Sequence, residues 1–152
     1  CFKLATEDNF KDLQKRTLLN ATCFATELEK KGYRIVSGGT HNHLVLVDVR
    51  AKGLTGDVAE KTLELVGIIV NRNVIPNDPE KPDIASGIRI GSPAITSRGM
   101  REAEVVQIVE MMDRALMNRE TKEVLDLVAS EVSELCKKFP VLIPAREGVF
   151  SS

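Results

Sequence analysis

The most constraining feature of this chain is a single cation, Arg89, inside a short apolar segment bounded by Gly87 and Gly91. Burying a guanidinium without an anion is strongly unfavourable, so Arg89 must face solvent or meet a carboxylate or phosphate. The neighbouring Ile88 and Ile90 give the alternation of a strand with one buried face. Two interpretations stay open, a strand whose polar face carries one arginine and a strand that presents Arg89 to an anionic ligand.

Length and composition predict one globular domain with a substantial core, since the chain has 152 residues, 43% hydrophobic and 28% charged. A net charge of −1 gives no reason to expect nucleic acid or a membrane as partner. No apolar run approaches the roughly 20 residues that span a bilayer. We therefore expect a cytoplasmic protein. Because the chain begins at Cys1, we also expect a fragment, and an upstream targeting segment stays an open alternative.

Apolar periodicity predicts an α+β fold, with helices packed on a small, mainly antiparallel sheet. Helices are expected at residues 7–31, 57–66, 98–118 and 121–138, and strands at 33–37, 43–49, 68–70 and 87–91. Turn-type residues at 38–42 indicate a hairpin between the first two strands. Residues 71–85 contain three prolines, which exclude helix and central strand and predict a long loop.

The sequence gives little support for a metal or nucleotide site. His41 and His43 would point to the same side of a strand, but Asp48 has the opposite parity and supplies no third ligand. The three cysteines lack metal-type spacing and are expected to be reduced and buried. The glycine pairs are not followed by a helix with the lysine of a phosphate-binding loop.

Four segments in series resemble the C-terminal part of serine hydroxymethyltransferase. They are residues 36–48 (VSGGTHNHLVLVD), 52–56 (KGLTG), 70–79 (VNRNVIPNDP) and 86–99 (SGIRIGSPAITSRG). Several motifs in order at compatible spacing are far more specific than one, and the resemblance runs from about residue 10 to residue 140. It implies the C-terminal small domain of a fold-type I pyridoxal phosphate enzyme over residues 1–140, with the helix at 7–31 leading in from a large domain. Residues 141–152 are expected to form a partly disordered tail.

The resemblance also implies roles for particular residues. Arg89 occupies the position of the arginine that binds the carboxylate of the amino acid substrate. Asn73 matches the asparagine that contacts the pterin of folate. The loop residues Lys81, Pro82 and Asp83 match a second folate contact, although the family often has Ser-Pro-Phe there and this chain lacks the aromatic residue.

Family members interconvert serine and glycine with pyridoxal phosphate and tetrahydrofolate, and they form homodimers or tetramers. They hold pyridoxal phosphate on the lysine of a His-Lys-Thr motif, which is absent from this sequence. The resemblance therefore implies that the missing large domain of the same polypeptide holds the cofactor. We expect this chain to be inactive alone. The alternative is a stand-alone α+β ligand-binding or regulatory module without catalysis.

Overall fold

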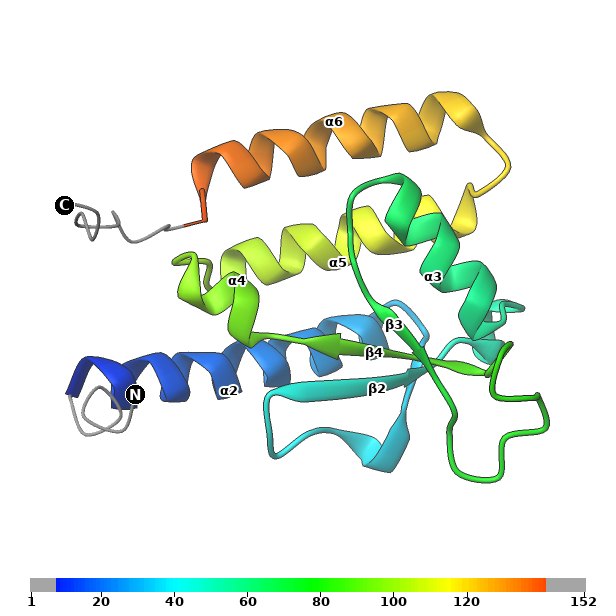
Figure 1. Ribbon diagram of the computed structural model, residues 1–152, viewed down its shortest axis with the longest axis horizontal. Helices are drawn as coiled ribbons and strands as arrows, with labels where there is room; N and C mark the ends of the chain where they lie inside the picture. The colour runs from blue at the N-terminus through cyan, green and yellow to red at the C-terminus, as the bar shows by residue number, and fades with distance from the viewer. Residues whose placement is uncertain (1–7, 142–152) are drawn as a thin grey trace, which may run out of the picture.

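In a computed structural model, which describes residues 8–141, helices are layered against a four-stranded antiparallel sheet (Figure 1). The elements are α2 (Asp8–Lys30), β1 (Arg34–Ile35), η1 (Val36–Gly38), β2 (Leu44–Asp48), η2 (Arg50–Lys52), α3 (Gly56–Leu65), β3 (Asn71–Asn73), β4 (Gly87–Gly91), α4 (Pro93–Ser97), α5 (Glu102–Met117) and α6 (Lys122–Lys138). The predicted α+β fold is confirmed. The expected helix start at residue 7 and the tail beyond residue 141 lie outside the described residues.

The sheet has the order β1-β2-β4-β3, so β4 lies between two partners. Val45 pairs with Ile90 and Val47 with Ile88, and these four side chains are buried. Because side chains alternate along a strand, the intervening residues face the other side of the sheet. The sheet therefore has one face buried under helices and one face that the described residues leave largely open.

The core lies between the buried sheet face and the helices. Helices α2 and α3 contact the sheet, α5 packs against both of them, and α6 packs against α5 (Figure 1). The buried side chains include Phe24, Leu28, Leu63, Val105, Val109, Met112, Leu116 and Val128. No described helix has both the length and the apolar character needed to cross a membrane.

Two glycines follow the helices whose ends the sequence predicts at residues 31 and 66. Gly32 and Gly67 adopt φ of 86° and 82°, a left-handed conformation that residues with a Cβ adopt at a cost. The next residue closes each helix, because Tyr33 N–H donates to Leu28 O and Ile68 N–H to Leu63 O. These caps direct the chain from α2 into β1 and from α3 toward β3.

The strand expected at residues 68–70 is wrong, because the observed strand is β3 at Asn71–Asn73. The N–H of Ile68 is used in the cap of α3, and Ile69 is 76% exposed. Pairing begins only at Asn71, where the chain lies opposite Arg89 of β4. The apolar run marks the approach to the edge strand and is not the strand itself.

The helix expected at residues 98–118 is also wrong at its start. The chain forms the separate helix α4, with Pro93 in its first turn, and α5 begins at Glu102. Gly99, at φ 91°, separates the two helices. The side chain of Glu104 accepts the N–H of Arg101 at 2.8 Å and so caps the new helix.

The two glycines of β4 provide a matched test of this packing. A Cβ on Gly87 would lie 2.6 Å from Ile75 Cγ2 and 2.8 Å from Asn73 O, whereas on Gly91 the nearest atom is Leu44 Cδ2 at 3.5 Å. We expect Gly87→Ala to lower the free energy of unfolding by about 1–3 kcal/mol through overpacking. Gly91→Ala should change it by less than about 0.5 kcal/mol. Urea denaturation of both variants measures the difference, and equal stabilities would contradict the register of β3 against β4.

Candidate functional site

Arg89 lies at the middle of β4 on the open face of the sheet. Its neighbours Ile88 and Ile90 are buried at 1% and 5% exposure, so alternation directs Arg89 away from the core. Leu46 on β2 and Asn71 on β3 are its cross-strand partners. No hydrogen bond or ion pair to its guanidinium occurs within residues 8–141. Arg89 is therefore an exposed cation on a rigid strand, with its donors available to an anion.

Asn73 ends β3 opposite Gly87, two residues from the position opposite Arg89. The same parity along β3 and β4 places Asn73 and Arg89 on one face of the sheet. The Asn73 Nδ2 donates to Val74 O at 2.8 Å, which holds the half-buried amide close to its own backbone. The structure thus brings together two residues that are 16 positions apart in the sequence.

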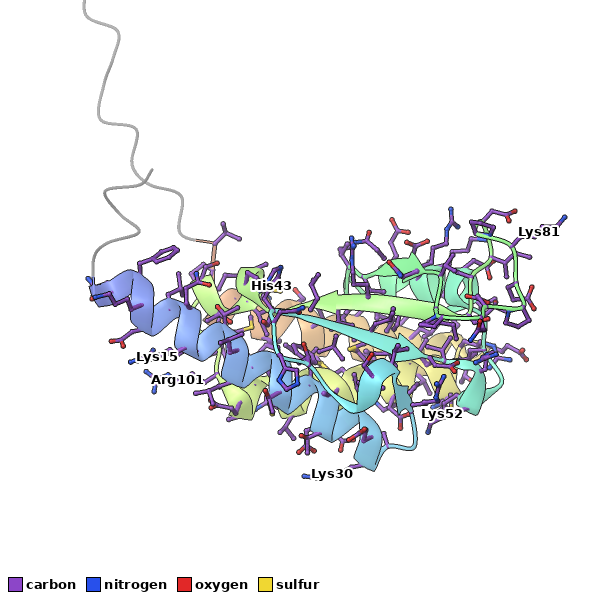
Figure 2. All side chains as sticks on the ribbon, turned by 90° about the horizontal axis from the view of Figure 1, so that it is seen from below. Lys15, Lys30, His43, Lys52, Lys81 and Arg101 are labelled. Carbon is purple, nitrogen blue, oxygen red and sulfur yellow. The ribbon has the colours of Figure 1, made fainter. Side chains whose placement is uncertain are left out.

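The other three predicted site residues do not join this pair. Lys81, Pro82 and Asp83 are exposed, and no described hydrogen bond or ion pair links them to Arg89 or Asn73. Lys81 projects away from the body of the molecule (Figure 2). The loop turns here because Lys81 O accepts the N–H groups of Ile84 and Ala85.

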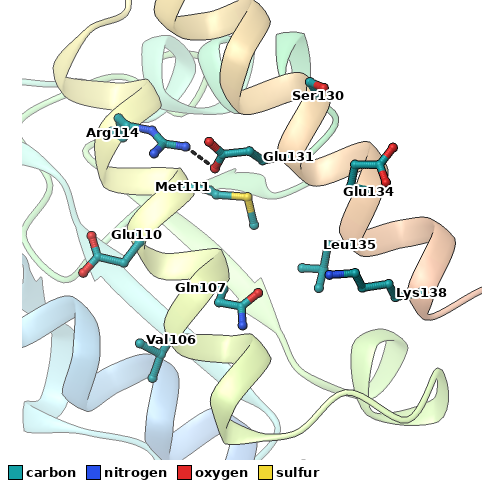
Figure 3. A pocket seen from close by; sticks show the side chains of 10 residues that line it. All are labelled: Val106, Gln107, Glu110, Met111, Arg114, Ser130, Glu131, Glu134, Leu135 and Lys138. Carbon is teal, nitrogen blue, oxygen red and sulfur yellow. Dashed lines mark hydrogen bonds and ion pairs between the residues drawn. The ribbon is translucent and has the colours of Figure 1, made fainter.

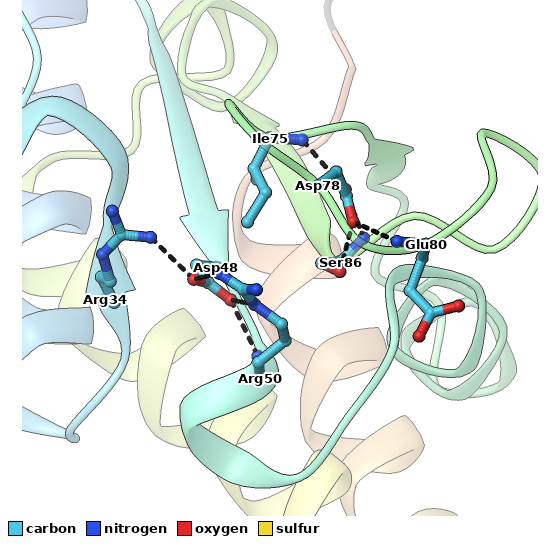
Figure 4. Close-up of polar contacts among 7 residues, drawn as sticks. All are labelled: Arg34, Asp48, Arg50, Ile75, Asp78, Glu80 and Ser86. Carbon is cyan, nitrogen blue, oxygen red and sulfur yellow. Dashed lines mark hydrogen bonds and ion pairs between the residues drawn. The ribbon is translucent and has the colours of Figure 1, made fainter.

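Asp78 organises the base of that loop, a role that the sequence analysis missed. Its Oδ2 accepts the N–H groups of Ile75 and Ser86 at 3.1 and 2.9 Å, and its Oδ1 accepts the Ser86 hydroxyl at 2.6 Å and the Glu80 N–H at 3.0 Å (Figure 4). Desolvation alone would raise the pKa of Asp78, but these hydrogen bonds outweigh it and hold the pKa well below its usual range. The Asn-Asp-Pro sequence, typical of turns, was the available signal.

Asp48 forms a second carboxylate centre at the end of β2 (Figure 4). It is 3% exposed and accepts Arg34 Nη1 at 2.8 Å and Arg50 Nη2, Nε and N–H at 2.7, 3.0 and 3.0 Å. The Arg50 hydrogen bond, with those of Arg34, lowers the pKa of Asp48 to about 2 despite burial. This cluster ties β1 to β2 and leaves one net positive charge.

The remaining candidates show no ligand chemistry. His41 and His43 are exposed, and no group of three or more metal-binding side chains occurs in the described part of the chain. Cys23 and Cys136 are free, as expected, but they are half-buried, so their expected burial is wrong. Cys1 lies outside the described residues. Burial, followed by the charges of Glu27 and Glu102, raises the pKa of the Cys23 thiol, which keeps it protonated at neutral pH.

Cavities lined by described residues lie on the helical side of the molecule. A groove of about 390 Å³ between α5 and α6 is crossed by an ion pair between Arg114 and Glu131 (Figure 3). A second cavity, of about 310 Å³, is lined mainly by apolar side chains, among them Ile68, Ile90 and Met112. Neither cavity is lined by Arg89 or Asn73, so the candidate site is the open sheet face.

Fold and site together define an α+β module that presents an arginine fork and an amide on adjacent strands of an open sheet face. Residues 1–112 match the family described as serine hydroxymethyltransferase. Two curated relatives of that name, from Nitrosomonas eutropha and Polynucleobacter asymbioticus, are each 51% identical to the chain over 140 residues, which is 92% of the chain and 34% of each relative. The chain belongs to the serine hydroxymethyltransferase family. It spans about a third of the length of these relatives.

The low pKa of Asp48 predicts that the fold loses stability in acid as this carboxylate becomes protonated. Its ion pairs stabilise the fold fully above the unfolded pKa of about 3.9 and are lost as pH falls toward about 2. We expect a contribution on the order of 1–2 kcal/mol, allowing for solvent screening of the two arginines. The stability gap between the wild type and Asp48→Asn should therefore shrink as the pH falls from about 4 to about 2, the range set by these two pKa values.

The measurement is the free energy of unfolding at several pH values. The control is Asp126→Asn, which changes an exposed aspartate of α6. A constant gap between the wild type and Asp48→Asn across this range would contradict the assignment.

Proposed function

We propose that residues 1–140 form the C-terminal small domain of a serine hydroxymethyltransferase, followed by a tail at 141–152. In the complete polypeptide this enzyme interconverts serine and glycine, with tetrahydrofolate as co-substrate and pyridoxal phosphate as cofactor. The observation that carries the proposal is the exposed guanidinium of Arg89, which the described residues leave without an anionic partner. The cytoplasmic location expected from the sequence stays a prediction.

Arg89 is proposed to bind the carboxylate of serine or glycine. A planar guanidinium can donate two parallel N–H bonds to both carboxylate oxygens, which fixes the orientation of the amino acid as well as its position. That orientation decides which bond at Cα is aligned for cleavage. The anchored β4 strand suits this role, since Ile88 and Ile90 lock the backbone on either side.

Asn73 is proposed to hydrogen-bond the pterin ring of tetrahydrofolate, whose edge offers both donors and acceptors to an amide. Its position on the face that carries Arg89 supports this role. Lys81, Pro82 and Asp83 are the proposed further folate contacts. Their exposed position on the loop between β3 and β4 leaves them accessible to a ligand beyond the sheet.

The described residues do not fit pyridoxal phosphate, which requires a sheltered lysine amine free to react. All described lysines are exposed except Lys31 and Lys52. Their amines lie 2.6 Å from Glu110 and 3.2 Å from Asp113. We therefore assign the cofactor to the large domain of the same polypeptide.

An apolar surface on α2 supports the contact with further protein. Leu18 and Leu19 are 45% and 54% exposed on a helix whose opposite side packs in the core. Adjacent exposed leucines are typical of a surface that another domain or subunit covers. The large domain is the proposed partner, and the complete enzyme is proposed to form homodimers or tetramers.

The isolated chain is expected to be inactive. Incubation with pyridoxal phosphate followed by borohydride reduction should give only slow labelling at scattered surface lysines, because no described lysine is sheltered and unpaired. Peptide mass spectrometry distinguishes scattered from specific labelling. A stoichiometric adduct at one lysine would contradict the assignment of the cofactor to the large domain.

Arg89→Ala in the complete polypeptide tests the proposed function. Loss of a two-pronged ion pair should weaken serine and glycine binding by about 2–5 kcal/mol, or roughly 30- to 4000-fold. Arg89→Lys should remain clearly impaired, because it keeps the charge and loses the fork. Fold stability should be nearly unchanged, because Arg89 is exposed and its guanidinium makes no hydrogen bond or ion pair within residues 8–141.

The matched control is Arg72→Ala, on the adjacent strand. Arg72 lies opposite Ile88 and pairs with Glu60 at 3.6 Å, so it belongs to the other face. Amino acid affinity should be retained in this variant. Near-normal glycine affinity in Arg89→Ala would contradict the proposal.

A further inference from the structure

We propose that Asp78 is a positioning residue, which sets the spacing between Asn73 and Arg89 by tying the end of β3 to the start of β4. This inference rests on the proposed function of those two residues and adds a third side chain to the site. Asp78 itself lies outside the strands and is not proposed to touch a substrate.

The geometry of the Asp78 carboxylate carries the inference. One oxygen, Oδ2, accepts both the Ile75 N–H and the Ser86 N–H, at 3.1 and 2.9 Å. Ile75 follows Asn73 by two residues, and Ser86 precedes Arg89 by three. A single atom therefore joins the two backbone segments that position the candidate site residues (Figure 4).

The two segments are in direct contact, so a change in one is passed to the other. Gly87 packs so closely that a Cβ there would lie 2.6 Å from Ile75 Cγ2 and 2.8 Å from Asn73 O. Close-packed groups cannot shift independently. A movement of Ser86 away from Ile75 would thus shift Asn73 relative to the strand that carries Arg89.

The backbone before Ser86 depends on an external restraint. Ala85 adopts φ 56°, a left-handed conformation that an alanine does not favour, and it is fully buried. Such a residue keeps its conformation when its surroundings over-determine it. The two bonds from Ser86 to Asp78, at 2.9 Å from the N–H and 2.6 Å from the hydroxyl, supply part of that restraint directly after Ala85.

A carboxylate suits this task better than an amide. All four of its contacts are to donors, so both oxygens must act as acceptors. An ionised carboxylate offers two acceptor oxygens, whereas asparagine offers one oxygen and one donor group. Asp78→Asn can keep one oxygen for the Ile75 and Ser86 N–H groups, but it loses the second acceptor, which takes the Glu80 N–H and the Ser86 hydroxyl. The two substitutions Asp78→Asn and Asp78→Ala should therefore give graded effects.

The test compares variants of the complete polypeptide with pyridoxal phosphate bound, at a temperature well below unfolding. We expect Asp78→Ala to raise the KM for serine and the Kd for tetrahydrofolate together, by on the order of tenfold to a hundredfold, the size expected for a displacement of about 1 Å. Asp78→Asn should give a smaller rise in both. The control is Glu80→Ala, which removes a nearby side-chain carboxylate and keeps the Glu80 backbone N–H that contacts Asp78. This variant should leave both constants unchanged.

A merely structural role would lower thermal stability and leave KM and Kd unchanged in the folded enzyme, and that result would overturn the inference. If Asp78→Ala does not fold, Ser86→Ala takes its place, because it removes the hydroxyl bond and keeps the backbone bond. Ser86→Ala should then raise both constants, and unchanged values would again overturn the inference. Normal glycine affinity in Arg89→Ala would instead reject the proposed function, so the two failures are distinguishable.

Discussion

The alternation of side chains along β4 is the constraint on which the candidate site depends. Ile88 and Ile90 are buried against the helices, and each lies opposite a buried valine of β2. Turning Arg89 inward would require a one-residue slip, which would expose both isoleucines and bury a guanidinium. Packing of Ile88 and Ile90 in the hydrophobic core thus fixes the position of Arg89, whose side chain lies outside the core.

Two loop positions at the same end of the sheet, where β2 ends and β4 begins, are held by carboxylates whose hydrogen-bonding capacity is satisfied. Asp48 binds Arg34 and Arg50 at one position, and Asp78 binds backbone and hydroxyl donors at the other. Arg89 contrasts with both, since it lies in a rigid setting with no anion among residues 8–141. The guanidinium of Arg89 is therefore available to bind an anion that a ligand or another domain supplies.

The sequence predicted much of this fold because its signals were local. Apolar periodicity located α2, α3 and α6, and Gly32 and Gly67 marked helix ends through their own conformation. Arg89 could be singled out because a cation between isoleucines is conspicuous within a few residues. Asn73 and the folate loop were found only through the family resemblance, since nothing in their local pattern indicates a ligand.

The predictions that failed concern features that depend on contacts between distant parts of the chain. The position of β3 depends on where the chain meets β4, and the apolar run at 68–70 does not reveal that meeting point. The break between α4 and α5 depends on the left-handed conformation of Gly99. A single glycine in the sequence does not reveal which conformation it will adopt. Asp78 escaped notice because its partners Ile75 and Ser86 come together only in the folded loop.

The central claim is that this chain contributes the carboxylate-binding arginine to an active site completed by the rest of the polypeptide. A crystal structure of the complete enzyme with pyridoxal phosphate and glycine tests it most directly. The account predicts two guanidinium nitrogens of Arg89 within about 3 Å of the two glycine carboxylate oxygens. A glycine carboxylate held by another side chain, with Arg89 facing solvent, would contradict it.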